Sequence, residues 1–119
     1  YIYVRMGAYT FIHKRTEDDI WKNLFELPLV ETEKDLSEEE FLACPQFHAL
    51  FAEGEVRMVR TLLRGVKHVL SHRVIYTNFY EVTLPDNSSS FSSYQRVAVE
   101  DLGRYAVPRL IHAFLEKYV

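Results

Sequence analysis

Residues 56–84 constrain the fold more than any other part of the chain, because they form a long run of strand-forming residues with one polar break. The run reads VRMVRTLLRGVKHVLSHRVIYTNFYEVTL. β-Branched and aromatic residues favour extended backbone, and after the break apolar residues alternate as in a strand. Ser71, His72 and Arg73 form the break. The pattern therefore predicts two antiparallel strands joined by a turn at these three residues.

The first of these two strands has a competing interpretation. Apolar residues within 56–70 also fit the stripe of an amphipathic helix. Gly65 and the β-branched residues favour the strand, because glycine weakens a helix interior and β-branched side chains suit a pleated surface. We therefore expect residues 56–70 to be extended.

Turn and helix signals dominate the first 54 residues. Ser37, followed three positions later by Glu40, is a capping-box pattern that predicts the start of a helix. Pro45 suits a first helical turn and is expected to restart the helix, to about Gly54. Before them we expect two strands joined at Met6-Gly7 within residues 1–15, a polar turn at 16–19, and a loop with a short edge strand over 20–31.

The last third of the chain ends in a helix signal. Residues 85–94 form a serine-rich loop that we expect to be mobile, and residues 94–100 fit a final strand. Pro108 is expected to open a C-terminal helix, with an apolar face of Leu110, Ile111, Phe114, Leu115 and Tyr118. Strands, short helices, further strands and a closing helix predict one α+β domain over residues 1–119, with a mixed or antiparallel sheet.

Composition favours an intracellular protein. The 119 residues include one cysteine, Cys44, which excludes an intrachain disulfide and a cysteine-ligated iron–sulfur cluster within this chain. A single cysteine favours a reducing compartment, and Cys44 fits a small half-buried hydrophobe. No apolar run reaches the ~20 residues of a membrane span. Because the sequence starts in strand-forming residues without methionine or a secretory leader, we expect a cytoplasmic piece of a longer polypeptide.

Charge is segregated along the chain, although the net charge is only −3. Between Glu31 and Glu55 there are eight acidic residues and one basic residue, Lys34, whereas from Arg57 to Arg73 there are five basic residues and no acidic one. Two solvated faces of opposite charge are the simpler interpretation. The low net charge argues against a nucleic-acid partner, but a basic run leading into the Ser-His pair leaves phosphate contacts open.

The candidates for catalysis are weak. The acidic residues 38–40, with His48, could hold a divalent metal by residue type, but the helix macrodipole also explains acidic residues in a first turn. Ser71 and His72 do not form a catalytic dyad by themselves, because adjacent side chains of extended backbone point to opposite faces. Structural roles are expected for His13, His68, His112 and Trp21, the last as a core anchor.

The order of several short segments resembles a known family. A first hairpin ending FIHKR, the segment DIWKNLFELPLVE, a basic strand leading into KHVLSH, an aromatic strand and YAVPRLIHAFL follow one another. This order is similar to the C-terminal domain of the A/G-specific adenine DNA glycosylases, the MutY family, over essentially the whole chain. The most specific element is the family's Phe-Ser-His loop, which stands here as Leu70, Ser71 and His72.

The resemblance implies a Nudix (MutT-like) fold without the Nudix hydrolase machinery. Nudix enzymes hold Mg²⁺ with the clustered carboxylates of an Arg-Glu-x-x-Glu-Glu motif. Residues 21–28 keep the approach to that motif, but Leu29 and Val30 stand where two glycines are expected, and no such motif follows. We therefore expect a chain that is itself non-catalytic and holds no metal or cofactor.

For function, the resemblance implies recognition of 8-oxoguanine opposite adenine in duplex DNA, as part of base excision repair of 8-oxoguanine:A and G:A mispairs. An N-terminal glycosylase domain of the same polypeptide, with a 4Fe–4S cluster, would excise the adenine near the nucleoid. Because Leu70 replaces the family's aromatic residue, a stacking contribution at this position is either lost or supplied by another aromatic residue such as Tyr76. The expected contacts are Leu70, Ser71 and His72 for the lesion, and Arg64, Lys67 and Arg73 for phosphate.

Two other functions stay open at this point. A divergent Nudix-type pyrophosphohydrolase would use the carboxylates of residues 38–40 on nucleoside diphosphate derivatives. A protein-interaction module would instead dock partners through its apolar surface.

Overall fold

The computed structural model describes residues 1–16, 18 and 21–119. Parts of the turn predicted over residues 16–19 and of the loop predicted over 20–31 lie outside the described residues. The expected edge strand and final strand are present, and the α+β class is confirmed. In chain order the elements are β1 (Ile2–Arg5), β2 (Tyr9–Lys14), β3 (Phe25–Glu26), α1 (Glu38–Ala43), α2 (Pro45–His48), β4 (Met58–Val69), β5 (Val74–Thr83), β6 (Gln95–Ala98), the 3₁₀ helix η1 (Val99–Arg104) and α3 (Arg109–Tyr118).

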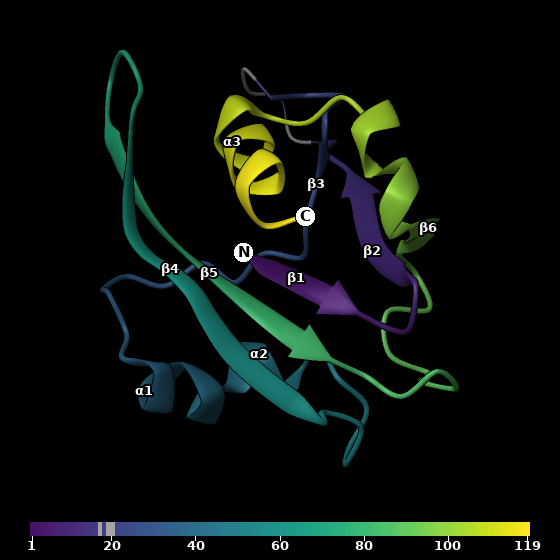
Figure 1. The fold of residues 1–119 in the computed structure, drawn as a ribbon. Coiled ribbons are helices and arrows are strands. Elements are labelled where there is room, and N and C mark those ends of the chain that lie inside the picture. The colour runs from purple at the N-terminus through teal and green to yellow at the C-terminus, as the bar shows by residue number, and fades with distance from the viewer. Residues whose placement is uncertain (17, 19–20) are drawn as a thin grey trace.

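The strands form two three-stranded sheets (Figure 1). One sheet has the order β1-β5-β4, with β1 parallel and β4 antiparallel to β5, and the other is the antiparallel sheet β3-β2-β6. The two strands predicted in residues 1–15 are present and are joined by a tight turn at the predicted Met6-Gly7, but the hairpin expected there does not extend beyond that turn, because each strand pairs in a different sheet. They meet at a bridge between Met6 and Tyr9. Gly7, at φ +60°, supplies the bend that carries the chain between the sheets.

Strand β5 packs against helices on both faces. Successive side chains of a strand point in opposite directions, and here two neighbouring aromatic side chains are both buried. Phe79 stacks on Phe114 of α3, with ring centroids 4.3 Å apart. Tyr80 stacks on Phe41 of α1, also at 4.3 Å. The C-terminal half of β5 is therefore buried on both faces, because α3 and α1 lie on opposite sides of it.

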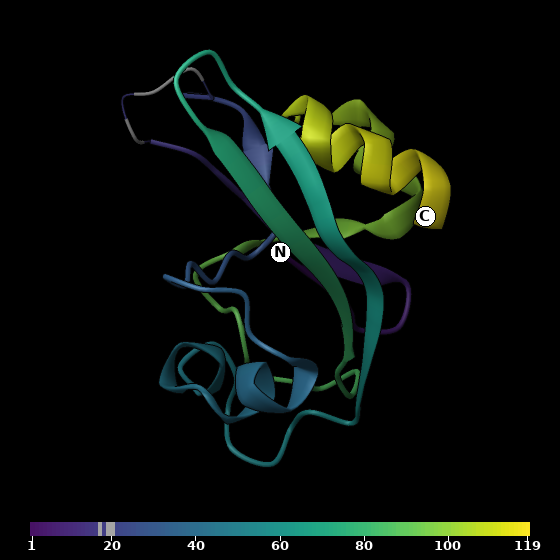
Figure 2. The same cartoon turned by 90° about the vertical axis from the view of Figure 1, so that its left-hand side faces the viewer.

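Strands β4 and β5 form a long antiparallel hairpin, whose free end extends past the rest of the sheet (Figures 1 and 2). The strand interpretation of residues 56–70 is thereby confirmed. Near the middle of the hairpin the register shifts, and Gly65 adopts φ +64°, a conformation that suits glycine. The Gly65 N–H donates to the Asn78 side-chain oxygen at 2.7 Å, which holds this irregular segment in place.

The first helix begins as its cap predicts. The Glu40 N–H donates to the Ser37 hydroxyl at 3.1 Å, and the Ser37 N–H donates to the Glu40 carboxylate at 3.0 Å. Cys44, half-buried as predicted, is extended between α1 and α2, since a residue that precedes proline avoids helical backbone. Pro45 then starts α2, which ends at His48, well before the predicted end.

The C-terminal helix is also confirmed. Helix α3 begins directly after Pro108. Leu110, Ile111 and Phe114 of its predicted apolar face are buried. The 3₁₀ helix between β6 and α3 was not predicted, because its residues carry no helical periodicity of their own.

The serine-rich loop expected to be mobile is instead tied to Glu55. The carboxylate of Glu55 accepts hydrogen bonds from the hydroxyls of Ser88, at 2.8 Å, and Ser90, at 2.7 Å. The Ser89 N–H donates to the same carboxylate at 3.1 Å. The serines therefore act as donors that fix the start of the loop.

These hydrogen bonds predict a pH dependence of stability. The hydroxyls of Ser90 and Ser88, followed by the Ser89 N–H, lower the pKa of Glu55 from 4.5 to about 2. Because the folded pKa is the lower one, Glu55 adds stability above pH 4.5 that is lost as the pH falls toward 2. We expect Glu55→Gln to have a lower free energy of unfolding than the parent chain at neutral pH. In acid the two free energies of unfolding should become similar. Urea unfolding across this range measures the difference, with exposed Glu53→Gln as control; a difference that is constant with pH would contradict the expectation.

Candidate nucleic-acid interface

The free end of the β4–β5 hairpin is the predicted turn. The Leu70 N–H donates to the Arg73 carbonyl at 2.8 Å and closes it. Leu70 is half-buried, whereas Ser71, His72 and Arg73 are exposed. Within the part of the chain that the structure describes, the Ser71 hydroxyl and the His72 ring make no hydrogen bond. The turn therefore presents a hydroxyl and an imidazole to solvent.

The cations predicted to bind phosphate fall into two groups. Arg64 lies down the hairpin from the turn, and its guanidinium donates to both carboxylate oxygens of Asp35, at 3.1 and 3.2 Å. Lys67 and Arg73 are exposed near the turn and form no ion pair with any described residue. The structure thus brings Lys67 and Arg73 close to the predicted lesion contacts and places Arg64 in a different network.

Trp21 packs against the back of the hairpin. Its ring centroid lies 5.9 Å from that of His68 in β4, and the Arg15 guanidinium lies 5.7 Å from the centre of the indole. Trp21 is half-buried. The prediction that it anchors the core is therefore wrong, because Trp21 belongs to neither of the two clusters of buried apolar residues. His68 was predicted to be structural, and its contact with Trp21 fits that role.

A network around Asp35 joins the acidic segment to the hairpin. The Asp35 carboxylate accepts a hydrogen bond from the Asn78 side-chain amide at 2.9 Å, in addition to those from Arg64. Asn78 also accepts the Gly65 N–H. One carboxylate thereby connects residues on β4, β5 and the loop before α1, which fixes the position of that loop against the strands.

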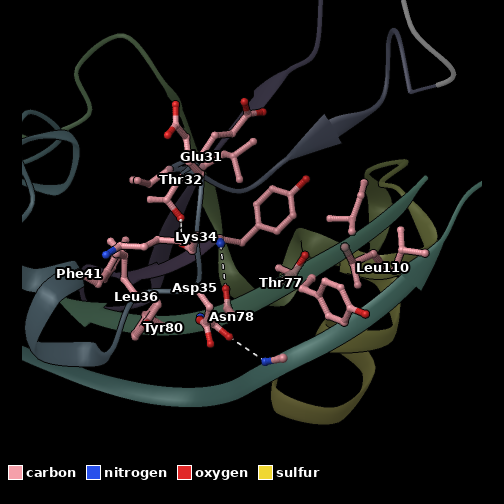
Figure 3. Close-up of a pocket in the computed structure, with 18 of the residues that line it drawn as sticks. Glu31, Thr32, Lys34, Asp35, Leu36, Phe41, Thr77, Asn78, Tyr80 and Leu110 are labelled. Atoms are coloured by element: carbon pink, nitrogen blue, oxygen red, sulfur yellow. Dashed lines mark hydrogen bonds between the residues drawn. The ribbon is translucent and has the colours of Figure 1, made fainter. Parts of the chain in front are cut away.

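Beside this network lies a cleft of about 670 Å³ (Figure 3). Residues 29–36 line one side and residues 73–78 of the hairpin line another. The wall formed by residues 29–36 carries three acidic side chains, Glu31, Glu33 and Asp35, and one basic side chain, Lys34. Phosphate groups are repelled by carboxylates, so this wall is unsuited to a nucleic-acid backbone, and the hairpin end is the better candidate for such contacts.

A buried ion cluster links β2 and β3 and was not predicted. Glu26 is only 2 % exposed. Its carboxylate contacts the Arg15 guanidinium at 2.7 Å, the His13 ring at 3.0 Å and the Tyr1 hydroxyl at 3.2 Å. Burial, together with the Glu26 carboxylate, raises the pKa of the Tyr1 phenol. His13 and Arg15, two positions apart on extended backbone, share one face, which was the available sequence signal for a common partner.

The acidic start of α1 has structural partners. Glu40 belongs to the capping box, whose Ser37 hydrogen bonds lower the pKa of Glu40, and Glu38 accepts a hydrogen bond from Thr61. Within the described residues, no three His, Cys, Asp or Glu side chains are grouped to hold a metal ion.

His112 contacts Glu116 at 3.5 Å across one turn of α3, in line with its predicted structural role.

Two three-stranded sheets, with α1 and α3 on opposite faces of β5, define a mixed α+β domain. The family model described as the NUDIX domain matches residues 1–117, and the chain belongs to this family. A comparison with curated proteins gave no match. Among the described residues, no helix has the length and apolar character required to cross a membrane.

Proposed function

We propose that this chain is the lesion-recognition domain of an A/G-specific adenine DNA glycosylase and that it contacts 8-oxoguanine opposite adenine in duplex DNA. The NUDIX domain match supports the fold that the proposal requires. The observation that carries the proposal is the exposed Ser71-His72 turn, whose side chains have no hydrogen-bond partner in the described part of the chain. In this proposal an N-terminal glycosylase domain, with a 4Fe–4S cluster, performs the excision inside the cell.

The chemistry of the turn suits the oxidised base. 8-Oxoguanine differs from guanine by a carbonyl at C8 and a hydrogen on N7, so an acceptor site becomes a donor. A serine hydroxyl can accept as well as donate, and Ser71 can therefore accept the N7–H. The exposed backbone of residues 71–72 can donate to the C8 oxygen. Guanine lacks both groups, so these contacts distinguish the two bases.

The free energy of a single hydrogen bond limits how much Ser71 can contribute to discrimination between 8-oxoguanine and guanine. One neutral hydrogen bond has a net value of about 0.5–1.5 kcal/mol. Since ~1.4 kcal/mol corresponds to a factor of ten in affinity, Ser71 supplies at most about tenfold discrimination. His72, the turn backbone and the partner domain must supply the remainder.

Phosphate contacts position the turn without reading the base. Lys67 and Arg73 are exposed and without an ion pair in the described part of the chain, so they are the cations we propose for this role. Arg64 can join them only by leaving Asp35. With two such contacts and a net charge of −3, the isolated chain should bind DNA weakly and lose affinity as salt increases.

The substitution Ser71→Ala tests the proposal. We expect it to reduce the preference for an 8-oxoguanine:A duplex over a G:A duplex by up to about tenfold, while affinity for the G:A duplex changes little. Fluorescence anisotropy at one low salt concentration measures both affinities. Ser92→Ala is the matched control, because Ser92 is exposed on the loop between β5 and β6, away from the turn.

Two results would contradict this proposal. One is equal affinity of the parent chain for both duplexes, and the other is an equal loss of affinity for both duplexes in Ser71→Ala. If the amide resonances that shift on DNA titration spared residues 67–76, the alternative of a protein-interaction module would be favoured instead.

A further inference from the structure

One face of the hairpin end is apolar and uncovered. Val69 lies opposite Val74, and Lys67 lies opposite Tyr76, so the side chains of both pairs project from the same face. Val69 is 65 %, Val74 44 % and Tyr76 68 % exposed. We call these four residues, Lys67, Val69, Val74 and Tyr76, the hairpin platform. An exposed aromatic ring beside two exposed valines forms a contiguous apolar patch, and such a patch is more typical of a binding surface than of a surface that only contacts water.

The platform begins where the cover over β5 ends. Tyr80, on the same face of the strand, is stacked under Phe41. Asn78, two positions before it, is held by Asp35. Tyr76 is the next residue on this face and the first without such a cover. On the opposite face of the hairpin, His68 contacts Trp21, and this contact helps to hold the two strands that carry the platform in place.

Charge around the platform favours an anionic occupant. From Arg57 to Tyr80 the chain has no acidic residue. Lys67 on the platform and Arg73 beside it have no ion pair in the described part of the chain. Val74 and Tyr76 also line the cleft whose opposite wall carries acidic side chains. Of these, Asp35 is paired with Arg64, whereas Glu31 and Glu33 form no ion pair with a described residue, so a phosphate would lie on the Lys67 side of the Tyr76 ring, away from that wall. An occupant that combines a flat apolar surface with negative charge matches this surface, and a nucleotide has both.

We propose that Tyr76 is a stacking site for an unstacked DNA base, with Lys67 beside it for the adjoining phosphate. Aromatic side chains bind bases of any sequence through their faces, and lysine adds a salt-dependent contact to the backbone. The site lies next to Ser71 and His72, so an aromatic contact stands close to the turn although Leu70 itself has no ring. The proposal rests on the proposed function for the choice of DNA as partner, but it concerns base stacking and not the reading of the lesion.

Paired oligonucleotides can isolate the stacking contact. An oligothymidylate and an abasic strand of the same length carry the same phosphates, and only the first has bases. We expect the parent chain to bind the thymidylate about tenfold more tightly than the abasic strand at low salt. Tyr76→Ala should abolish this difference and Tyr76→Phe should keep it, because phenylalanine retains the ring. Tyr9→Ala, at an exposed tyrosine on the other sheet, should change nothing.

Four results would overturn the stacking site. They are undetectable binding of the thymidylate at low salt, equal affinity for both strands, a difference that survives Tyr76→Ala, and a difference that Tyr76→Phe loses. Ring resonances of Tyr76 should shift on addition of the thymidylate and stay in place with the abasic strand. Ser71→Ala should leave the stacking difference intact, so failure of this site and failure of lesion reading give different results.

Discussion

The substitution Phe79→Ala is expected to lower the free energy of unfolding by about 3–5 kcal/mol, as truncation of a fully buried phenylalanine usually does. The Phe79 side chain is fully buried at the centre of β5. Its ring stacks on Phe114 at 4.3 Å and on Tyr1 at 5.7 Å. Alanine would leave a cavity between β5 and α3, since both neighbours are held by the packing around them. Urea unfolding followed by circular dichroism measures the loss.

The matched control lies three positions earlier on the same strand. Tyr76→Ala removes an aromatic ring of similar size from an exposed position and should change stability by no more than about 0.5 kcal/mol. If Phe79→Ala does not fold, Phe79→Leu should still unfold at a lower urea concentration than the parent chain. Equal losses for Phe79→Ala and Tyr76→Ala would show that β5 is not the packed centre of the domain. A folded Tyr76→Ala also makes its DNA-binding result interpretable.

The second large effect is expected at the buried ion cluster. Removal of one partner from a buried charge pair leaves the other charge desolvated and typically costs about 3–5 kcal/mol. Glu26→Ala would deprive the buried Arg15 guanidinium of its partner at 2.7 Å, and His13 and Tyr1 would lose the same carboxylate. We therefore expect a loss of this size in the free energy of unfolding, measured by urea denaturation at neutral pH.

Two further variants separate charge from packing at this cluster. Glu26→Gln keeps the shape and the acceptor oxygen of the side chain, so it should be destabilised less than Glu26→Ala. Glu116→Ala breaks the exposed contact with His112, and exposed pairs contribute only about 0–1 kcal/mol. A loss for Glu26→Ala as small as that for Glu116→Ala would contradict the view that the buried pair stabilises the fold.

Much of the local structure could be predicted, because it depends on residues close together in the chain. The capping box of Ser37 and Glu40, the helix after Pro108 and the turn at residues 70–73 are each specified within a few positions. Strand partners could not be predicted in the same way. The strands of residues 1–15 were expected to pair with each other, whereas β1 pairs with β5, which follows about 70 residues later.

The candidate site shows the same division. The exposed turn with Ser71 and His72 was predicted from its polar residues between two strand signals. Which basic residues form ion pairs could not be predicted, because ion pairing depends on carboxylates distant in sequence. Arg64, for example, pairs with Asp35, which lies 29 positions away in the chain. Trp21 was misplaced for a related reason, since a large apolar residue predicts burial but not which neighbours will cover it.

The α+β class, the long hairpin, the turn that presents Ser71 and His72, and the resemblance that implies a Nudix fold could all be inferred from the amino-acid sequence alone. These features follow from local backbone preferences and from the periods of strands and helices, which neighbouring residues set. Tertiary packing leaves Lys67 and Arg73 without ion pairs among the described residues, leaves Tyr76 exposed while Tyr80 is covered, and buries Glu26 beside Arg15. The physical reason is that burial and charge pairing depend on which distant segments pack together, and the hairpin is covered by α1, α3 and residues 29–36 along only part of its length.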